Sequence, residues 1–203
     1  MNKKIIISLC VIGAVAAIAV GGTIAYFSDV ETSTGNTFTA GTLNLTLDDH
    51  DGDNVVKFTV TNANPGQSGV GTWKLVNAGS LAGYVDLESI TATDTEELNP
   101  ESETNKVEPG DLSANMDVVL FWDDGAGTGG VAGDGIQNGT EATIYSGKLS
   151  GIATNYNANY SLLASATTYV TMTWSVGTGV GNDIQGDKTV LGITFELGQD
   201  TTQ

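Results

Sequence analysis

Strict alternation of apolar and polar residues near the C-terminal end is the feature that most limits how this chain can fold. In the run TTYVTMTWSV, residues 167–176, every second position is apolar from Val170 to Val176, and Thr or Ser stands between them. A strand turns successive side chains to opposite faces, so a period of two predicts a strand with one buried face. The same pattern recurs in residues 190–197, with the apolar set Leu191, Ile193, Phe195 and Leu197.

Weaker alternation covers six further segments. These are residues 42–48, 55–61, 71–77, 83–90, 117–122 and 143–149. The chain has only 3 prolines, and its 27 glycines stand mostly at turn-like sites between these segments. About eight strands joined by Gly-, Asn- and Asp-rich loops predict an all-β fold, an antiparallel jelly-roll-like β-sandwich. Residues 160–166 allow one short helix, although it lacks a good cap.

The N-terminus has the layout of a secretory signal. Lys3 and Lys4 precede an uncharged apolar run, residues 5–20, and small residues follow. This order predicts a signal peptide of residues 1–25, in helical form, with cleavage between Ala25 and Tyr26. The alternative is that the run is retained as an uncleaved N-terminal anchor, because its length also suits a bilayer.

Cleavage would leave about 178 residues, enough for one domain with a substantial core. We expect an N-terminal segment of residues 26–41 and a sandwich domain of residues 42–203, without a second domain. The only cysteine, Cys10, lies in the signal, and the remaining 5 lysines and 24 acids give a net charge of 5 minus 24, or −19. Such a charge disfavours nucleic acid and anionic lipid as partners, so contact with a membrane is expected only through an uncleaved signal. Solubility alone would explain the same charge.

Catalytic residues are scarce. His50 is the only histidine, so a zinc site built from two or three imidazoles of one chain cannot form. No Gly-x-Ser-x-Gly motif is present, and a cysteine nucleophile is absent once the signal is removed. Carboxylates are too numerous for any one pair to be assigned to glycoside hydrolysis. We therefore predict a protein that is not an enzyme, with His50 as a solvated loop residue.

Calcium is the one cofactor that the acidic residues suggest. In GDGIQNGTE, residues 133–141, four residues match positions 5, 6, 9 and 12 of a calcium-binding loop: Asp134, Gly135, Asn138 and Glu141. Asp123 and Asp124 can complete the ligand shell by folding back across the long loop 123–141. The alternative is an acidic, solvated hairpin loop. Asp49, Asp51 and Asp53 form a weaker candidate, because Asn54 stands where the sharp-turn glycine is needed. Residues 94–111 are expected to form a second long loop.

Several segments resemble one known family. The opening segment combines Gly-Gly-Thr-x-Ala with AYFSD and FTAGTLNLTL, and three later blocks agree with it: FTVTNANPGQSG, WKLVNAGSLAGYVDL and IQGDKTVLGITFEL. Together they resemble the TasA/camelysin family of secreted proteins, over nearly the whole chain. The resemblance implies processing by a SipW-type signal peptidase and a secreted location, in an extracellular matrix or at the cell surface.

The resemblance also implies a function. Family members are jelly-roll subunits of biofilm-matrix fibres, or of bundling pili in archaea, and they assemble by donor-strand exchange. The partner would then be a second copy of the chain, in a head-to-tail homopolymer. Residues 26–41 would be the donor segment, with Tyr26, Phe27 and Phe38 as its apolar side chains.

Two alternatives stay open beside this structural role. The Tyr, Trp and Asn residues on β-patterned segments also suit a monomeric surface adhesin or carbohydrate-binding sandwich. Camelysin-type relatives have been classed as metallopeptidases, but a zinc site with two or three imidazole ligands needs more than the one histidine of this chain. Sequons at Asn44, Asn138 and Asn159 would matter only in a host that glycosylates secreted asparagines.

Overall fold

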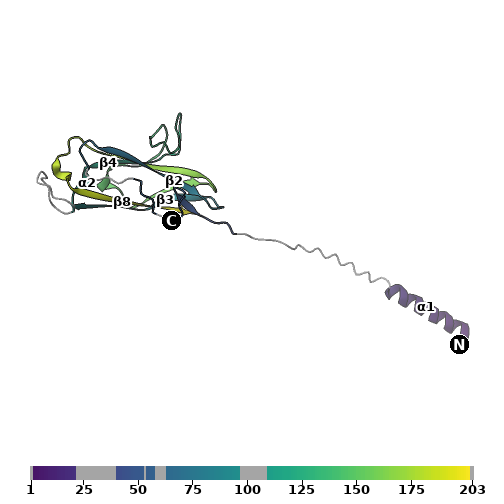
Figure 1. Cartoon of the computed structure of the whole chain (residues 1–203). Coiled ribbons are helices and arrows are strands. Elements are labelled where there is room, and N and C mark those ends of the chain that lie inside the picture. The colour runs from purple at the N-terminus through teal and green to yellow at the C-terminus, as the bar shows by residue number, and fades with distance from the viewer. Residues whose placement is uncertain (1, 22–39, 53, 58–62, 97–108, 202–203) are drawn as a thin grey trace. The chain divides into compact units, whose positions relative to one another are not determined.

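The computed structural model describes residues 2–21, 40–52, 54–57, 63–96 and 109–201 (Figure 1). The chain divides into two compact units, Met1–Thr39 and Ala40–Gln203. In the first unit, helix α1 (Lys3–Gly21) lies within the predicted signal, residues 1–25. Within the described residues, no helix is long and apolar enough to cross a membrane. The expected N-terminal helix is confirmed, while its removal after Ala25 stays a prediction.

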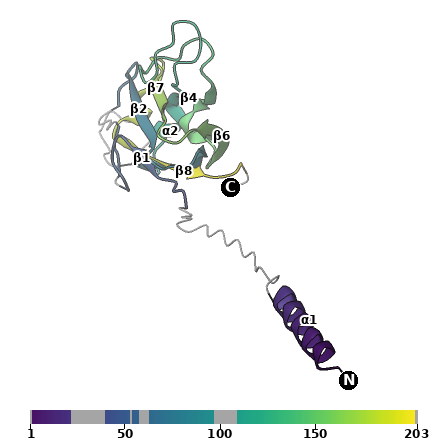
Figure 2. The same ribbon diagram turned by 90° about the vertical axis from the view of Figure 1, so that its right-hand side faces the viewer.

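The second unit is an antiparallel β-sandwich of two sheets (Figure 2). Among the described residues, one sheet has five strands in the order β1-β2-β7-β4-β5, and the other has three in the order β6-β3-β8. The strands are β1 (Leu45–Leu47), β2 (Ser68–Asn77), β3 (Gly83–Glu96), β4 (Met116–Trp122), β5 (Thr143–Lys148), β6 (Tyr156–Leu162), β7 (Thr167–Val176) and β8 (Asp187–Gly198). The short helices α2 (Leu112–Asn115), η1 (Leu149–Gly151) and η2 (Asn182–Ile184) lie in the connections. The predicted all-β sandwich is confirmed.

The core lies between the inner faces of the two sheets. In β7 the alternating residues Val170, Met172, Trp174 and Val176 are buried, as the pattern predicts. They pack in one cluster with residues of both sheets, among them Leu75, Val85, Leu87 and Leu120, which are fully buried. Burial of each such side chain contributes about 1.5–3 kcal/mol, which makes this cluster the main source of stability.

Three expectations about secondary structure are wrong in whole or in part. Residues 160–166 do not form a helix, because Tyr160 pairs with Val85 and Leu162 with Gly83 in the β3–β6 ladder. A turn follows, in which Ser165 has a positive φ of 61°. Residues 55–57 are not a strand either, and residues 58–61 of that predicted strand lie outside the described part. Of the expected loop 94–111, residues 94–96 belong to β3.

Candidate functional site

A groove of ≈ 580 Å³ lies between β1 and β8, the edge strands of the two sheets. Leu43, Leu45 and Leu47 line it from the β1 side. Ile193, Phe195 and Leu197 line it from the β8 side. The ring of Phe195 is 6.1 Å from that of Trp73, centroid to centroid, so the groove borders the core directly.

The apolar side chains of this groove are only partly buried. Leu45, Leu47, Ile193, Phe195 and Leu197 pack against the core cluster, yet all of them keep part of their surface exposed. On the neighbouring strand β3, by contrast, inward side chains such as Val85 and Leu87 are fully buried. The groove therefore holds apolar surface that a further layer of protein would cover favourably.

Strand β8 offers a long, regular edge beside the groove. It is 12 residues long, and within the described part of the chain β3 is its only strand partner. No residue of β8 has a positive φ, and the extra residue of the β3–β8 bulge, Glu88, belongs to β3. An edge strand carries a row of backbone groups that can pair with another strand, and bulges on the edge are one way in which proteins prevent such pairing. This edge of β8 lacks that protection.

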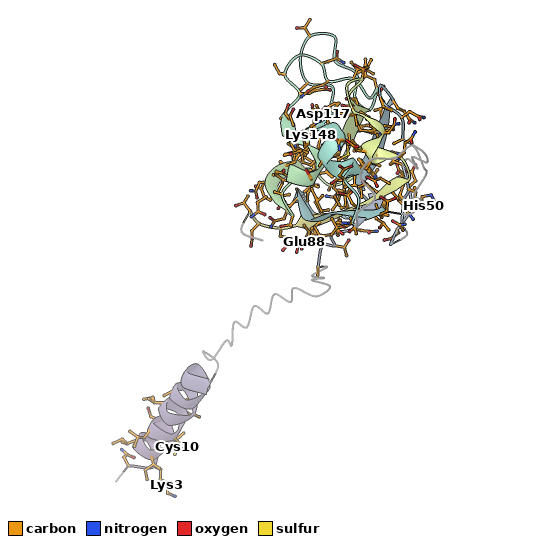
Figure 3. All side chains as sticks on the ribbon, turned by 90° about the vertical axis from the view of Figure 1, so that its left-hand side faces the viewer. Lys3, Cys10, His50, Glu88, Asp117 and Lys148 are labelled. Carbon is orange, nitrogen blue, oxygen red and sulfur yellow. The ribbon has the colours of Figure 1, made fainter. Side chains whose placement is uncertain are left out.

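Two titratable side chains lie on the rim of the groove. His50, labelled in Figure 3, is exposed. It forms a backbone bridge with Leu47, with 2.9 Å between the His50 nitrogen and the Leu47 oxygen. Burial raises the pKa of the Glu196 carboxyl, and the charges of Glu88 and Asp86 raise it further. The expectation of an exposed loop position for His50 agrees with the structure, but its place on this rim could not be read from the sequence.

The five residues predicted to bind calcium lie in one loop between β4 and β5, where their side chains bind the loop's own backbone. Asp123 is fully buried, and its carboxylate accepts hydrogen bonds from the N–H groups of Gly133 and Gly135, both at 2.8 Å. These two glycines have positive φ values of 76° and 79°. The hydroxyl of Thr171 donates a third bond to Asp123, at 2.7 Å.

The other four residues complete this arrangement, and among them Asn138 donates from Nδ2 to the carbonyl oxygen of Ile136 at 3.0 Å. Glu141 accepts from the N–H of Gly125 at 2.9 Å and from the N–H of Asn138 at 2.7 Å. Asp124 accepts from the N–H of Ala126 and from the hydroxyl of Tyr160, both at 3.0 Å. Asp134 accepts from the N–H of Ile136 at 2.8 Å.

These hydrogen bonds fix the loop, and the described residues include no group of three or more His, Cys, Asp or Glu side chains arranged to hold a metal. Calcium binding stays a prediction for this loop. In the weaker cluster, Asp49 pairs with Lys74 at 2.7 Å, and Asp53 lies outside the described residues. Ala25, Tyr26, Phe27 and Phe38 also lie outside them, so the cleavage site and the donor segment stay predictions.

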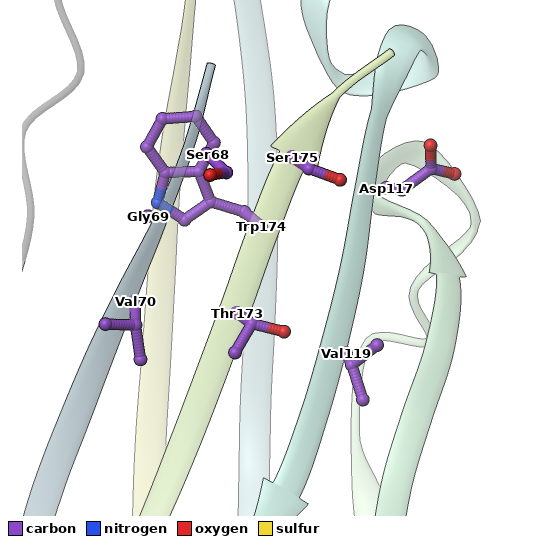
Figure 4. A pocket seen from close by; sticks show the side chains of 8 residues that line it. All are labelled: Ser68, Gly69, Val70, Asp117, Val119, Thr173, Trp174 and Ser175. Carbon is purple, nitrogen blue, oxygen red and sulfur yellow. The ribbon is translucent and has the colours of Figure 1, made fainter. Parts of the chain in front are cut away.

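A second hollow, of ≈ 470 Å³, lies over β2, β7 and β4 (Figure 4). The indole of Trp174 packs where Gly69 has no side chain, since a Cβ there would be 2.7 Å from the indole nitrogen. The one charged lining residue, Asp117, forms an ion pair with Lys148 at 3.0 Å (Figure 3). Ser175 lies opposite Asp117 in the β4–β7 ladder, but that carboxylate is ion-paired with Lys148, so the groove at β8 is the stronger candidate.

These features define a class: a β-sandwich domain that follows an N-terminal helix and has an open groove between two edge strands. Comparison with family models identifies the family. The model described as camelysin metallo-endopeptidase matches residues 1–203, and the chain belongs to this family. Comparison with curated proteins finds no significant match.

Proposed function

We propose that this chain is a secreted structural subunit that polymerises by strand addition at the β1–β8 groove. The observation that carries the proposal is the partly exposed apolar groove beside the regular, bulge-free edge of β8. Strand addition of this kind gains affinity from main-chain hydrogen bonds, and it gains register from alternating side chains that enter a groove.

The proposed donor is the segment 26–41 of a second copy. Phe38 and the aromatic tip, Tyr26 and Phe27, would supply its apolar side chains, each worth on the order of 2–3 kcal/mol when buried, before ordering costs. Each subunit has one donor segment and one groove, so the contact is head to tail. A heterologous contact that does not close gives an open filament.

Processing would control assembly in this scheme. Cleavage between Ala25 and Tyr26 by a SipW-type signal peptidase would free the donor tip, whereas without cleavage the tip stays joined to the N-terminal helix. The expected location is therefore outside the cell, in a matrix fibre or a pilus at the cell surface.

The family's name supplies an alternative, a metallo-endopeptidase. His50, the only histidine, is exposed on the rim of the groove. We expect that any proteolysis by a purified sample is unchanged in a His50→Ala variant. Proteolysis that survives purification and disappears in that variant would favour the enzyme. The adhesin alternative predicts monodisperse particles in electron microscopy, where the proposed function predicts fibres.

Removal of the donor tests the proposed function. Protein that begins at Tyr26 should form fibres, and protein that begins at Gly41 should stay monomeric, because it keeps the groove and loses the strand that fills it. A synthetic 26–47 peptide should stop fibre growth, while a scrambled peptide of the same composition should not. Equal polymerisation of the two proteins would show that residues 26–40 are not the donor.

A further inference from the structure

A third stretch of chain lines the groove besides β1 and β8. The backbone reverses directly after β1, where Leu47 and His50 exchange two backbone hydrogen bonds, both of 2.9 Å. Asn54 and Val55 follow this reversal and belong to the groove lining. The side chain of Val55 is partly buried against the core cluster. We call residues 54–57 the wall segment.

The wall segment has no place in either sheet. It belongs to no strand, and no backbone hydrogen bond joins it to another residue in the part of the chain that the structure describes. A stretch without backbone hydrogen bonds and with few buried side chains has low local stability. The position of the wall segment therefore depends on contacts of its side chains.

One side chain ties the wall segment to the five-stranded sheet. The ammonium of Lys57 lies 2.5 Å from Asp48 Oδ2, and only 19% and 20% of the two side chains are exposed. Loss of one partner of such a shielded pair leaves the other charge poorly solvated, so the pair resists separation.

Asp48 is itself fixed to β2. Its Oδ1 accepts a hydrogen bond from the N–H of Lys74 at 3.0 Å, and its own N–H donates to the carbonyl oxygen of Lys74 at 2.8 Å. Lys74 lies within β2, which is paired on both sides by β1 and β7. The ion pair between Lys57 and Asp48 therefore joins a loosely held segment to a firmly held strand.

We propose that Lys57 is a positioning residue, which fixes the wall segment through Asp48 and so gives the groove the shape that an added strand fits. The proposal rests on the proposed function, because it takes a strand as the occupant of the groove. A wall that is already fixed does not have to be ordered when the strand enters, which spares part of the cost of binding. Lys57 acts only through the wall segment, since it does not itself line the groove.

The first measurement asks whether the ion pair holds the wall segment. In protein that begins at Tyr26, Val55→Cys would supply the only thiol, and its rate of reaction with a maleimide reports how well this position is covered. Adding Lys57→Glu, which places a carboxylate beside Asp48, should raise that rate at least fivefold. The added negative charge disfavours the reactive thiolate, so a faster rate can come only from exposure.

Lys148→Glu is the matched control. It makes the same change of charge and breaks an ion pair of 3.0 Å with Asp117. That pair joins β4 and β5, at the opposite end of the five-stranded sheet from β1. The thiol should react in this control as in Val55→Cys alone. Lys57→Arg keeps a positive charge beside Asp48 and should also leave the rate unchanged.

The second measurement asks whether the held wall matters for assembly, in the same variants without Val55→Cys. Fibre growth, followed by light scattering, should be at least fivefold slower in Lys57→Glu than in wild type. Lys148→Glu and Lys57→Arg should grow fibres at the wild-type rate. All three variants should melt cooperatively, which separates a misplaced wall from an unfolded domain.

Several results would overturn the proposal. An unchanged labelling rate in Lys57→Glu would show that the ion pair does not hold the wall segment. Faster labelling with fibre growth as fast as wild type, or faster, would show that the wall segment does not position a strand. If Lys57→Glu does not melt cooperatively, Lys57→Met takes its place and should raise the labelling rate at least twofold. Wild-type protein that forms no fibres would refute the proposed function, and the labelling rates would still show whether Lys57 holds the wall segment.

Discussion

The two long edges of the sandwich differ in how their side chains cover the core. At the β5–β6 edge, aromatic rings bridge the gap: Trp122 stacks on Tyr160 with centroids 4.2 Å apart, and Tyr145 lies 6.3 Å from Tyr156. At the β1–β8 edge, a groove lies between rows of leucine, isoleucine and phenylalanine side chains. The first edge closes with its own residues, whereas the second leaves apolar surface for another segment.

The edge strands differ in the same sense. β5 and β6 both carry the extra residues of their bulges, against β4 and β3 respectively, and Asn159 in β6 has a positive φ of 50°. β8 carries no such irregularity. Bulges twist an edge away from a new partner, so the edges at β5 and β6 are protected and the edge at β8 is not. This contrast teaches that an open edge in this fold is a specific feature of β8.

The largest expected effect on fibre formation comes from a charge placed in the groove. Leu45→Glu should abolish fibre formation, because a carboxylate in the groove loses hydration when the donor strand enters. Ile144→Glu in β5 is the matched variant, since Ile144 is also partly buried against the core. Ile144→Glu should lower the free energy of unfolding about as much as Leu45→Glu does, but it should leave fibre formation intact. Electron microscopy and denaturant titration check the pair, and an equal loss of fibres in both would remove the distinction between the edges.

Next in size is the aromatic bridge of the closed edge. Trp122→Ala should lower the free energy of unfolding by about 3–5 kcal/mol, because Trp122 is nearly fully buried and the cavity cannot refill. Guanidinium titration measures the change. At permissive temperature the folded variant should still bind a 26–47 peptide, since the groove lies at the other edge. Loss of peptide binding by folded Trp122→Ala would contradict that separation.

A smaller effect concerns the start of β8. Asp187 is buried, and burial raises the pKa of its carboxyl, while N–H bonds from Asp111 and Leu112 oppose the rise and the Glu96 charge adds to it. A carboxyl whose pKa is higher in the folded state costs stability at neutral pH, and that cost disappears as pH falls through the folded pKa. Asp187→Asn should therefore raise the melting temperature at pH 7 and flatten its dependence on acidic pH. The alternative result, a lower melting temperature at pH 7, would mean that the charged form is stabilised.

The smallest expected effect is that of calcium on the β4–β5 loop. Any ion must compete with the backbone N–H groups that already bind Asp123 and Glu141, so we expect weak binding. At a calcium concentration equal to Kd, the free energy of unfolding rises by only about 0.4 kcal/mol. Chelation should lower the melting temperature slightly, and an Asp134→Ala, Glu141→Ala double variant should lose that sensitivity. Identical melting curves with and without chelator would remove calcium from this loop.

The sequence predicted the strands in which one face is strongly apolar. It did not predict a strand whose form depends mainly on pairing with a neighbouring strand. Residues 167–176 and 190–197 alternate clearly, and both lie in strands that cover the core. In β6 the run YNANYSL has small and amidic residues, so its strand form depends on the ladder with β3, which no local pattern reveals.

The candidate sites show the same limit. Asp123 and Glu141 resemble metal ligands in sequence, but their hydrogen-bond donors come from Gly133, Gly135, Gly125 and from Thr171 on another strand. The groove was not predicted, because Leu45 and Phe195 are 150 residues apart and meet only through the order of the two sheets.

Disulfide trapping tests the central claim, that β8 accepts the N-terminal segment of a second copy. Residues 26–203 contain no cysteine, so engineered pairs are the only thiols. Asn36→Cys would be combined with Val190→Cys or Thr194→Cys, exposed positions on β8, and in the control with Asn157→Cys, exposed on β6. On mild oxidation during assembly, at least one β8 pair should give a ladder of covalent oligomers, and the β6 pair should stay monomeric in denaturing gels. Cross-linking that is equal at the two strands, or greater at β6, would contradict the account.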